Sequence, residues 1–385
     1  MNILIAPDSF KESLTAKEVA LNIESGLKKS KLKCNTKILP MADGGEGTVQ
    51  SLVDATNGKI INTMVTGPLG DQIKSFFGVL GDNKTAVIEM AAASGLPLMK
   101  EHEKNPEKTT TYGTGELIKE ALDYGCNKII IGIGGSATND LGVGMAQALG
   151  ASFKDKNNNE ISLGGSELSN IKSIDLNNID SRALKAQIEV ACDVDNPLYG
   201  KTGAAYIYGP QKGATEEQIK RLDEGLRKAS EIIKKDLNIN IDKLPGAGAA
   251  GGLGGGLYAF LKAELKPGIE IVLEASKIDD LLNKDIDFVI TGEGKIDGQT
   301  IYGKTPIGVA KAAKKYNIPV IAICGSVGDN ASKVLDYGID SYFSILNSPI
   351  TFEQAKKLTP LLIEDISLNI GNLMNNSFKW SEINE

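Results

Sequence analysis

The sequence is poor in the two residue types that most often handle protons and anions in enzymes. Its 385 residues include one histidine, His102, which lies in the charged stretch Lys100–Lys104. A histidine-based triad, an H-E-x-x-H zinc site and a Cys/His zinc site all need partners that this composition lacks. The arginines are few: Arg182, Arg221 and Arg227. Anion binding must therefore depend on lysines, backbone N–H groups or a metal ion.

Other scarcities narrow the class of protein. The cysteines Cys34, Cys126, Cys192 and Cys324 stand far apart, which is typical of free thiols in a reducing compartment. No apolar run approaches the ~18 residues of a membrane span, and the first residues lack the basic flank of a signal peptide. With 49 acidic and 42 basic residues, the net charge of −7 argues against nucleic-acid binding. We therefore expect a cytoplasmic protein with small-molecule partners, no membrane and no nucleic acid.

The hydrophobic pattern predicts two α/β domains, which also suits the length of the chain. A β-α-β pattern opens the chain at 2–39, and alternating strands and helices return after about residue 284. Between them, the runs 60–65, 73–80 and 85–90 indicate an antiparallel meander, followed by further α/β segments.

We therefore predict one sheet assembled from both chain ends. A Rossmann-like α/β domain with a mostly parallel sheet would comprise 1–65 plus 285–385, and an inserted α/β domain with a mixed sheet would comprise 66–284. We expect the active site in the cleft between the two domains. Glycine is abundant, and its 43 residues cluster between apolar segments, where a backbone can approach a ligand or a neighbour closely.

Polar loops follow the strands of the first domain, where an open parallel sheet binds its ligands. A single aspartate in such a loop is more often a helix N-cap than a catalytic group, but many charged groups at one edge favour a binding site. Carboxylates around one site suit Mg²⁺, which takes few carboxylates together with phosphate oxygens and water. These loops carry Asp8, Lys11, Asp43, Glu46, Glu293, Lys295 and Asp297.

The inserted domain has a second set of candidates. The turn Gly134–Asp140 follows a strand and opens a helix, so its N–H groups could bind an anion, or it could serve close packing alone. Strand alternation would aim Asp193 and Asp195 to the same side, and an Asx-capped turn is the alternative. Lys212 lies in a sharp turn, and the run Gly246–Gly256 could seat a nucleotide or allow close helix–strand contact.

Three glycine motifs match nucleotide-binding patterns formally. Gly298–Thr305 fits G-x-x-x-x-G-K-[ST], but a P-loop begins directly after its strand, and we expect this strand to end at Thr291. Gly246–Gly251 fits G-x-G-x-x-G without a convincing strand before it. Gly132–Ala137 is better placed but lacks a second strand that ends in an acidic residue about 20 positions on.

The loops together favour phosphoryl transfer, which needs positioning, a metal ion and positive charge rather than a histidine or cysteine nucleophile. At these same loops the sequence resembles the type 1 glycerate kinase family. One departure is Leu141, where the family pattern has glycine after Asp140. The resemblance runs in order through nearly the whole chain, in the segments Ala6–Ala16, Pro40–Thr48, Ile133–Asp140, Ala191–Gly200, Gly209–Thr215, Gly246–Gly256 and Gly292–Pro306.

The resemblance implies phosphorylation of D-glycerate by ATP, with 2-phosphoglycerate favoured over 3-phosphoglycerate, in a protein of two α/β domains. The roles of single residues are our hypotheses. We expect Asp193, Asp43 and Lys11 to act in catalysis, with Asp193 or Asp43 accepting or orienting the hydroxyl proton of glycerate. The other expected residues bind substrate (Asp8, Ser9, Lys212, Gly44, Gly45), ATP (Gly134, Gly135, Ser136, Thr138, Asn139, Lys295, Lys304) and Mg²⁺ (Asp195, Glu293, Asp297).

Two other functions stay open at this point. An NAD-dependent oxidoreductase of a small hydroxy acid would use the turn at Gly132. A non-catalytic sugar-acid-binding protein would bind without turnover, although so many carboxylates would repel an anionic ligand. The oligomeric state is unknown from the sequence.

Overall fold

The computed structural model describes residues 1–383, and the side chains of residues 1–376. The chain forms two compact units. The terminal unit comprises Met1–Asp43, Gln50–Asn57 and the residues from Ile269 onward, and the inserted unit comprises Gly44–Val49 and Gly58–Gly268. These limits differ from the expected 65 and 285, because the strand at residues 59–66 pairs within the inserted unit.

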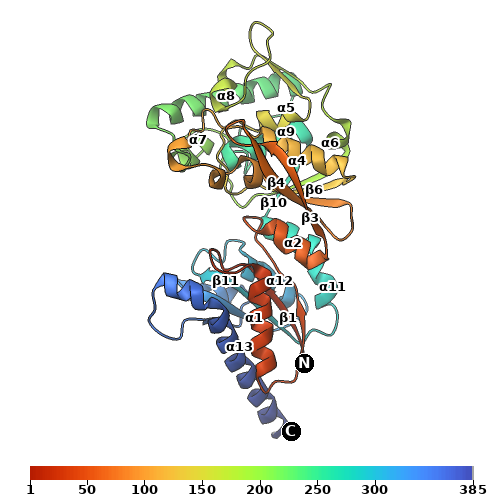
Figure 1. The fold of residues 1–385 in the computed structure, drawn as a ribbon, viewed down its shortest axis with the longest axis vertical. Coiled ribbons are helices and arrows are strands. Elements are labelled where there is room, and N and C mark those ends of the chain that lie inside the picture. The colour runs from red at the N-terminus through yellow and green to blue at the C-terminus, as the bar shows by residue number, and fades with distance from the viewer. Residues whose placement is uncertain (384–385) are drawn as a thin grey trace. The chain divides into compact units, whose positions relative to one another are not determined.

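The terminal unit is built on a parallel sheet to which both chain ends contribute (Figure 1). Among the described residues, every strand pair in this sheet is parallel, which confirms the Rossmann-like prediction. Its order is β13 (Ser341–Ser344), β12 (Val320–Val327), β11 (Phe288–Ile296), β1 (Asn2–Pro7) and β2 (Asn35–Ile38).

Helices α1 (Ala16–Lys29) and α13 (Phe352–Ile383) pack together and share a core with the sheet through Ile5, Ile23 and Ile363. Helix α1 begins at a capping box, in which Thr15 and Glu18 each accept a backbone N–H of the other. The remaining helices assigned wholly or mainly to this unit are α2 (Thr48–Thr56), α10 (Gly268–Ala275), α11 (Ile278–Leu282) and α12 (Thr305–Lys314).

The inserted unit has a mixed sheet, as predicted. Strands β10, β9, β6 and β5 pair in parallel, and β5, β4 and β3 form the expected antiparallel meander. The sheet order is β10 (Glu264–Lys266), β9 (Gln187–Ala191), β6 (Lys128–Gly132), β5 (Thr85–Glu89), β4 (Gln72–Val79) and β3 (Lys59–Thr66). A separate antiparallel pair joins β7 (Ser152–Lys154) to β8 (Ser173–Asp175).

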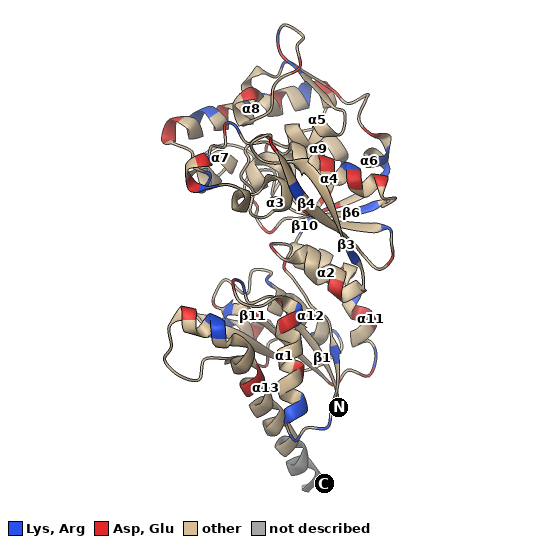
Figure 2. Cartoon of the chain, in the orientation of Figure 1, with Lys and Arg blue, Asp and Glu red and all other residues tan. Residues whose placement is uncertain are grey.

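Helices pack against this mixed sheet around one large apolar core, in which Phe153 and Phe260 make an edge-to-face contact. The long α8 begins at a capping box formed by Thr215 and Gln218, and both acidic and basic side chains lie along it (Figure 2). The helices are α3 (Ala91–Ser94), α4 (Tyr112–Asp123), α5 (Val143–Ala148), α6 (Ser181–Lys185), α7 (Ala204–Tyr208), α8 (Glu216–Leu237) and α9 (Leu253–Leu261).

One expected strand end is wrong. Strand β11 runs to Ile296 rather than to Thr291, because Lys295 and Ile296 continue the ladder with Ser326 and Val327 of β12. The G-x-x-x-x-G-K-[ST] match at Gly298 therefore starts two residues after the strand, closer to it than expected.

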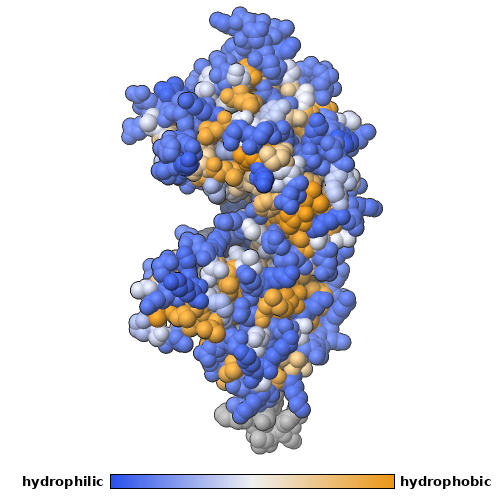
Figure 3. All heavy atoms as spheres, in the orientation of Figure 1, coloured by the Kyte–Doolittle hydropathy of each residue, from blue (hydrophilic) through white to orange (hydrophobic). Residues whose placement is uncertain are grey.

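The face drawn in Figure 3 is mainly hydrophilic, with smaller apolar areas. Within the described residues, none of the helices is both long enough and apolar enough to span a membrane.

Candidate active site

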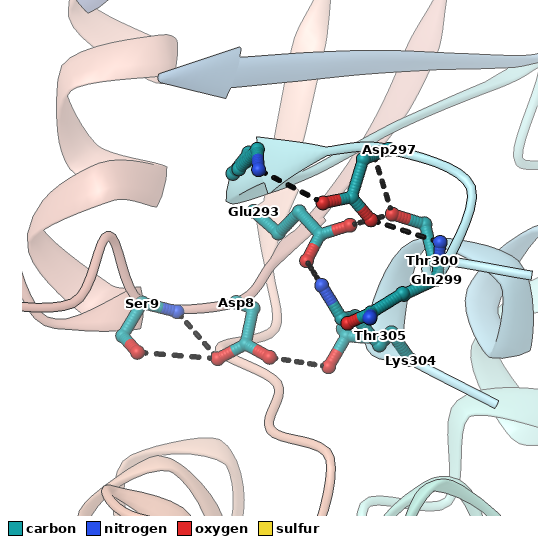
Figure 4. A network of polar contacts seen from close by, with 9 residues as sticks. Asp8, Ser9, Glu293, Asp297, Gln299, Thr300, Lys304 and Thr305 are labelled. Atoms are coloured by element: carbon teal, nitrogen blue, oxygen red, sulfur yellow. Dashed lines mark hydrogen bonds and ion pairs between the residues drawn. The ribbon is translucent and has the colours of Figure 1, made fainter. Parts of the chain in front are cut away.

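Two buried carboxylates stand at one edge of the parallel sheet in the terminal unit. Asp8 directly follows β1 and is 8% exposed, and Glu293 lies in β11 and is 7% exposed. Parallel pairing of Pro7 with Gly292 brings the two carboxylates to the same sheet edge. Figure 4 shows both side chains beside the loop that joins β11 to α12.

That loop holds both carboxylates through its own side chains. Thr305 Oγ1 donates to Asp8 Oδ2 at 2.6 Å, and Thr300 Oγ1 donates to Glu293 Oε1 at 2.6 Å. Lys304 Nζ lies 2.9 Å from Glu293 Oε2. Neither threonine was among the site residues expected from the sequence. The formal glycine-lysine match that ends at Thr305 was the one available signal.

Asp8 has an electrostatic environment that favours its neutral form. Burial, and then the negative charge of Asp43, raise its pKa from 3.8 to about 7. Hydrogen bonds from Thr305 and Ser9 and the positive charge of Lys11 act in the opposite direction. The backbone N–H of Ser9 donates to Asp8 Oδ1 at 2.6 Å. The terminal unit thus brings together four of the expected catalytic and substrate-binding residues.

Asp297 shapes the start of the same loop. Its Oδ1 accepts from the backbone N–H of Gln299 at 2.9 Å, and its Oδ2 lies 3.1 Å from Lys295 Nζ. The Gln299 N–H is the main cause that lowers the pKa of Asp297, whereas burial raises the pKa of Glu293. Asp297 therefore carries its charge readily, as a cation ligand or a turn former must.

The carboxylates at this sheet edge offer oxygen donors of the kind that Mg²⁺ takes. Across residues 1–383, no group of three His, Cys, Asp or Glu side chains is placed to hold a metal ion. Mg²⁺ normally takes one or two carboxylates and completes its shell with phosphate oxygens and water. Glu293 and Asp297, on one strand and its loop, fit that donor chemistry for an ion that arrives with phosphates. Asp195 belongs to the inserted unit. The magnesium ligands stay a prediction.

The inserted unit holds a buried lysine against the turn that follows β6. Lys212 is 1% exposed, and its Nζ donates to Ser136 Oγ and to the backbone oxygen of Thr138, both at 2.7 Å. Burial lowers the pKa of Lys212 to about 7, opposed by the charge of Asp140. The expected residues Ser136, Thr138 and Lys212 are therefore neighbours.

Three polar atoms beside this lysine lack a protein partner. Thr138 Oγ1 and both side-chain polar atoms of Asn139 are buried and accept or donate no hydrogen bond within the described part of the chain. An unpaired buried polar group costs roughly 1–3 kcal/mol, so native proteins keep few of them. Two adjacent residues with such atoms, next to a buried cation, indicate a place arranged for a polar or anionic ligand.

Asp140, the last residue of the turn Gly134–Asp140, holds that turn in place through hydrogen bonds. Its Oδ2 accepts from Thr111 N and Thr111 Oγ1, both at 2.8 Å, and its Oδ1 accepts from Gly142 N at 3.2 Å. The next residue, Leu141, adopts φ 56°, a left-handed conformation that glycine takes without steric cost. This conformation is the physical reason for a glycine at that position of the family pattern.

The glycine run Gly246–Gly256 packs against the same turn. A Cβ at Gly251 would lie 1.9 Å from the backbone oxygen of Thr138, and one at Gly256 would lie 2.0 Å from that of Leu141. Of the two interpretations of this run, close backbone contact is therefore the one that the geometry supports. Gly44 also lies too close to a neighbouring residue for a side chain, since a Cβ there would lie 2.7 Å from the Cβ of Ala191.

The acids after β9 do not follow strand alternation. The strand ends at Ala191, so the expectation that Asp193 and Asp195 share one side loses its basis. Both residues are exposed. Asp193 Oδ1 accepts from the backbone N–H of Gly268 at 2.8 Å, at the first residue of α10. Asp193 thus caps the start of α10 from a distant segment rather than closing a local Asx turn, and a catalytic role of Asp193 stays a prediction.

Comparison with known proteins agrees with this picture over the whole chain. A family model described as "Glycerate kinase family" matches residues 3–375. The chain is 57% identical to a glycerate kinase of Haemophilus influenzae, covering 90% of this chain and 92% of that protein. It is 53% identical to the glycerate 2-kinase of Escherichia coli, covering 92% and 93%. A crystal structure of a glycerate kinase 2 from Salmonella typhimurium superposes with a TM-score of 0.91 at 50% identity, covering 98% and 99%.

Proposed function

The chain belongs to the glycerate kinase family and is a phosphotransferase with an alcohol group as acceptor, and we propose that it transfers the γ-phosphoryl group of ATP to the 2-hydroxyl of D-glycerate. The observation that carries this proposal is the match at more than half identity along nearly the full length of relatives with that activity in their names. The buried lysine and carboxylates suit the chemistry, because phosphoryl transfer depends on positioning and charge.

In this proposal the inserted unit binds phosphate oxygens. Ser136, Thr138 and Asn139 offer hydroxyl and amide groups, and Lys212 offers the positive charge that a phosphate needs. The backbone N–H groups of Gly134 and Gly135 extend the same turn, where successive amides can bind an anion. Lys212 serves the γ-phosphate or the carboxylate of glycerate, and one buried cation suits either anion.

The terminal unit supplies the polar groups around the acceptor. Ser9, Lys11 and Asp43 each act on Asp8, through hydrogen bonds or through charge. Lysine can hold the glycerate carboxylate, and an aspartate can take the proton of the hydroxyl. We propose that Lys295 and Lys304 of this unit bind ATP. Gly44 and Gly45, in the segment that first leaves the terminal unit, complete the substrate side.

Mg²⁺ would enter with ATP and be held by Glu293 and Asp297, with Asp195 as a further candidate. When bound, the ion neutralises charge that develops on the phosphate oxygens. The chain's own residues then orient the acceptor hydroxyl and hold its proton. We further propose a cytoplasmic location, which suits an enzyme that draws on cellular ATP.

Phosphorus NMR of the product from D-glycerate and Mg-ATP tests the proposed function. A 2-phosphate couples to one carbon-bound proton and gives a doublet, whereas a 3-phosphate couples to two and gives a triplet. We expect the doublet, together with the signals of ADP. A triplet would correct the position of transfer, and ATP that stays intact in the presence of D-glycerate would refute the activity. L-glycerate is the matched control for the configuration at the acceptor carbon.

A further inference from the structure

Thr305 holds the buried carboxylate of Asp8 across the longest sequence separation among the site's contacts. Its side chain is fully buried, at 0% exposure, and its Oγ1 lies 2.6 Å from Asp8 Oδ2, although 297 residues separate the two in the chain. Thr305 is the first residue of α12, so the helix fixes its backbone. The contact therefore sets where one oxygen of Asp8 lies.

The two oxygens of Asp8 are in different situations. Oδ1 accepts from Ser9 N at 2.6 Å and from Ser9 Oγ at 3.3 Å. Within the described residues, Oδ2 accepts one hydrogen bond, the one from Thr305. A carboxylate oxygen has two lone pairs, so Oδ2 keeps one with which it can accept a further proton.

We propose that Asp8 is the group that takes the proton of the reacting glycerate hydroxyl, and that Thr305 is its positioning residue. The inference rests on the proposed function and replaces its open choice between Asp193 and Asp43. Asp193 is exposed, and its Oδ1 already accepts from the backbone N–H of Gly268. Asp43 is less buried than Asp8 and acts on Asp8 through its charge.

The step balances without a further reactant. The glycerate hydroxyl oxygen forms a bond to the γ-phosphorus while the bond from that phosphorus to the β-γ bridging oxygen breaks. ADP leaves with the bonding electron pair, and the hydroxyl proton passes to Asp8 Oδ2. Asp8 releases the proton to water after the product leaves. Thr305 Oγ1 continues to donate to Oδ2 and so favours the charged form that must start the next cycle.

Several charged groups face this carboxylate. Asp43 follows β2 and makes Asp8 harder to ionise, and Lys11, in the loop after β1, makes it easier. On the neighbouring β11, Glu293 is already paired with Lys304. Loss of the Thr305 hydrogen bond should therefore move the ionisation of Asp8 to higher pH, and loss of the Asp43 charge should move it to lower pH.

The test is the pH profile of kcat/KM for D-glycerate at saturating Mg-ATP. In Thr305→Val the acidic limb should move up by about one pH unit, because a hydrogen bond to a charged group is worth about that much. At pH 6 the loss should then be about tenfold, and it should nearly vanish at pH 9. Thr305→Ser keeps the hydroxyl and should restore the parental profile. Asp43→Asn should move the limb in the opposite direction.

The matched control is Thr359→Val in α13, which also removes a buried threonine hydroxyl, one that donates to Ala355 O within the helix. It should leave the profile unchanged. An unchanged midpoint in Thr305→Val, a loss that is equal at all pH values, or Asp8→Asn with parental kcat would each overturn the inference. A parent chain that fails to phosphorylate D-glycerate would instead overturn the proposed function. If Thr305→Val does not fold, Asp43→Asn decides the question: a shift of the acidic limb to lower pH supports the inference, and an absent or upward shift overturns it.

Discussion

The two units solve the problem of buried charge in opposite ways. In the terminal unit, both oxygens of each of the buried carboxylates Asp8 and Glu293 meet a donor from the chain. In the inserted unit, Lys212 is just as buried, yet polar atoms of Thr138 and Asn139 beside it have no partner among the described residues. The buried carboxylates of the terminal cluster thus each have partners within the chain, whereas the unpaired atoms of the inserted cluster need a ligand to satisfy them.

Asp8 and Lys212 carry opposite charges when ionised, but burial brings the pKa of both to a similar value. Burial moves the pKa of Asp8 up to about 7 and that of Lys212 down to about 7. With a pKa of about 7, each group can gain or lose its charge near neutral pH, so small changes in its surroundings change its charge. Proton acceptance and anion binding both benefit from such a group, and neither shift stabilises the free protein at pH 7.

The largest expected effect concerns the backbone that supports the inserted cluster. Gly251→Ala should lower the free energy of unfolding by roughly 4 kcal/mol, because the residue has φ +70° and its Cβ would strike the oxygen of Thr138. Gly70→Ala is the matched control, since Gly70 also has a positive φ, +93°, but nothing lies within 4 Å of its Cβ. Urea unfolding of both variants measures the difference. Equal losses of unfolding free energy in the two variants would show that the cost comes from the positive φ and not from the contact with Thr138.

The next effect tests the lysine itself. Lys212→Met should reduce kcat/KM by about a hundredfold, as expected when a buried charge that pairs with an anion is removed. Lys220→Met, at an exposed position of α8, should leave the rate nearly unchanged. Steady-state kinetics with D-glycerate and ATP varied in turn would show which substrate depends on Lys212. A Lys212→Met enzyme with parental kcat/KM for both substrates would remove the lysine from the site.

The pH dependence of stability should have opposite signs in the two units. Folded Asp8 retains a proton that the unfolded chain loses above pH 3.8, so its contribution to stability falls as pH rises toward about 7. Folded Lys212 has lost a proton that the unfolded chain keeps up to pH 10.5, so its contribution rises from about pH 7 upward.

The variants Asp8→Asn and Lys212→Met separate these contributions. At pH 8, Asp8→Asn should be more stable than the parent by about 2 kcal/mol, and the gain should shrink toward pH 4. The free energy of unfolding of Lys212→Met, relative to the parent, should be highest below pH 7. This difference should decrease toward pH 10. Urea unfolding across pH 4–10 measures both trends, and parallel curves for parent and variants would contradict them.

The smallest effect distinguishes a surface ion pair from a binding group. The Lys295 side chain is 59% exposed beside Asp297, so Lys295→Ala should change the free energy of unfolding by less than about 0.5 kcal/mol. If Lys295 binds ATP as proposed, the KM for ATP should nevertheless rise severalfold. A KM that stays at the parental value would leave Lys295 as part of the surface. Lys314→Ala, which removes another partly exposed ion pair of this unit, is the control.

Local patterns predicted much of the fold. Both capping boxes, the meander and the parallel sheet from both chain ends follow from side-chain periodicity and turn residues, which act over a few positions. The errors arose where pairing with a neighbour overrode the local signal. β11 extends through Gly292 and Gly294 because β12 continues beside it, although the glycines made the segment look like a loop.

The sequence by itself determined the α/β class, the family and the set of acids and lysines from which a site could be made, because these depend on composition, spacing and motif order. Only the tertiary structure decided which of those groups are buried and what they meet. Thr305 reaches Asp8, and Lys212 reaches Ser136, across 297 and 76 positions of the chain. Contacts at such separations come from the packing of whole strands and helices, and burial then sets the ionisation of each group.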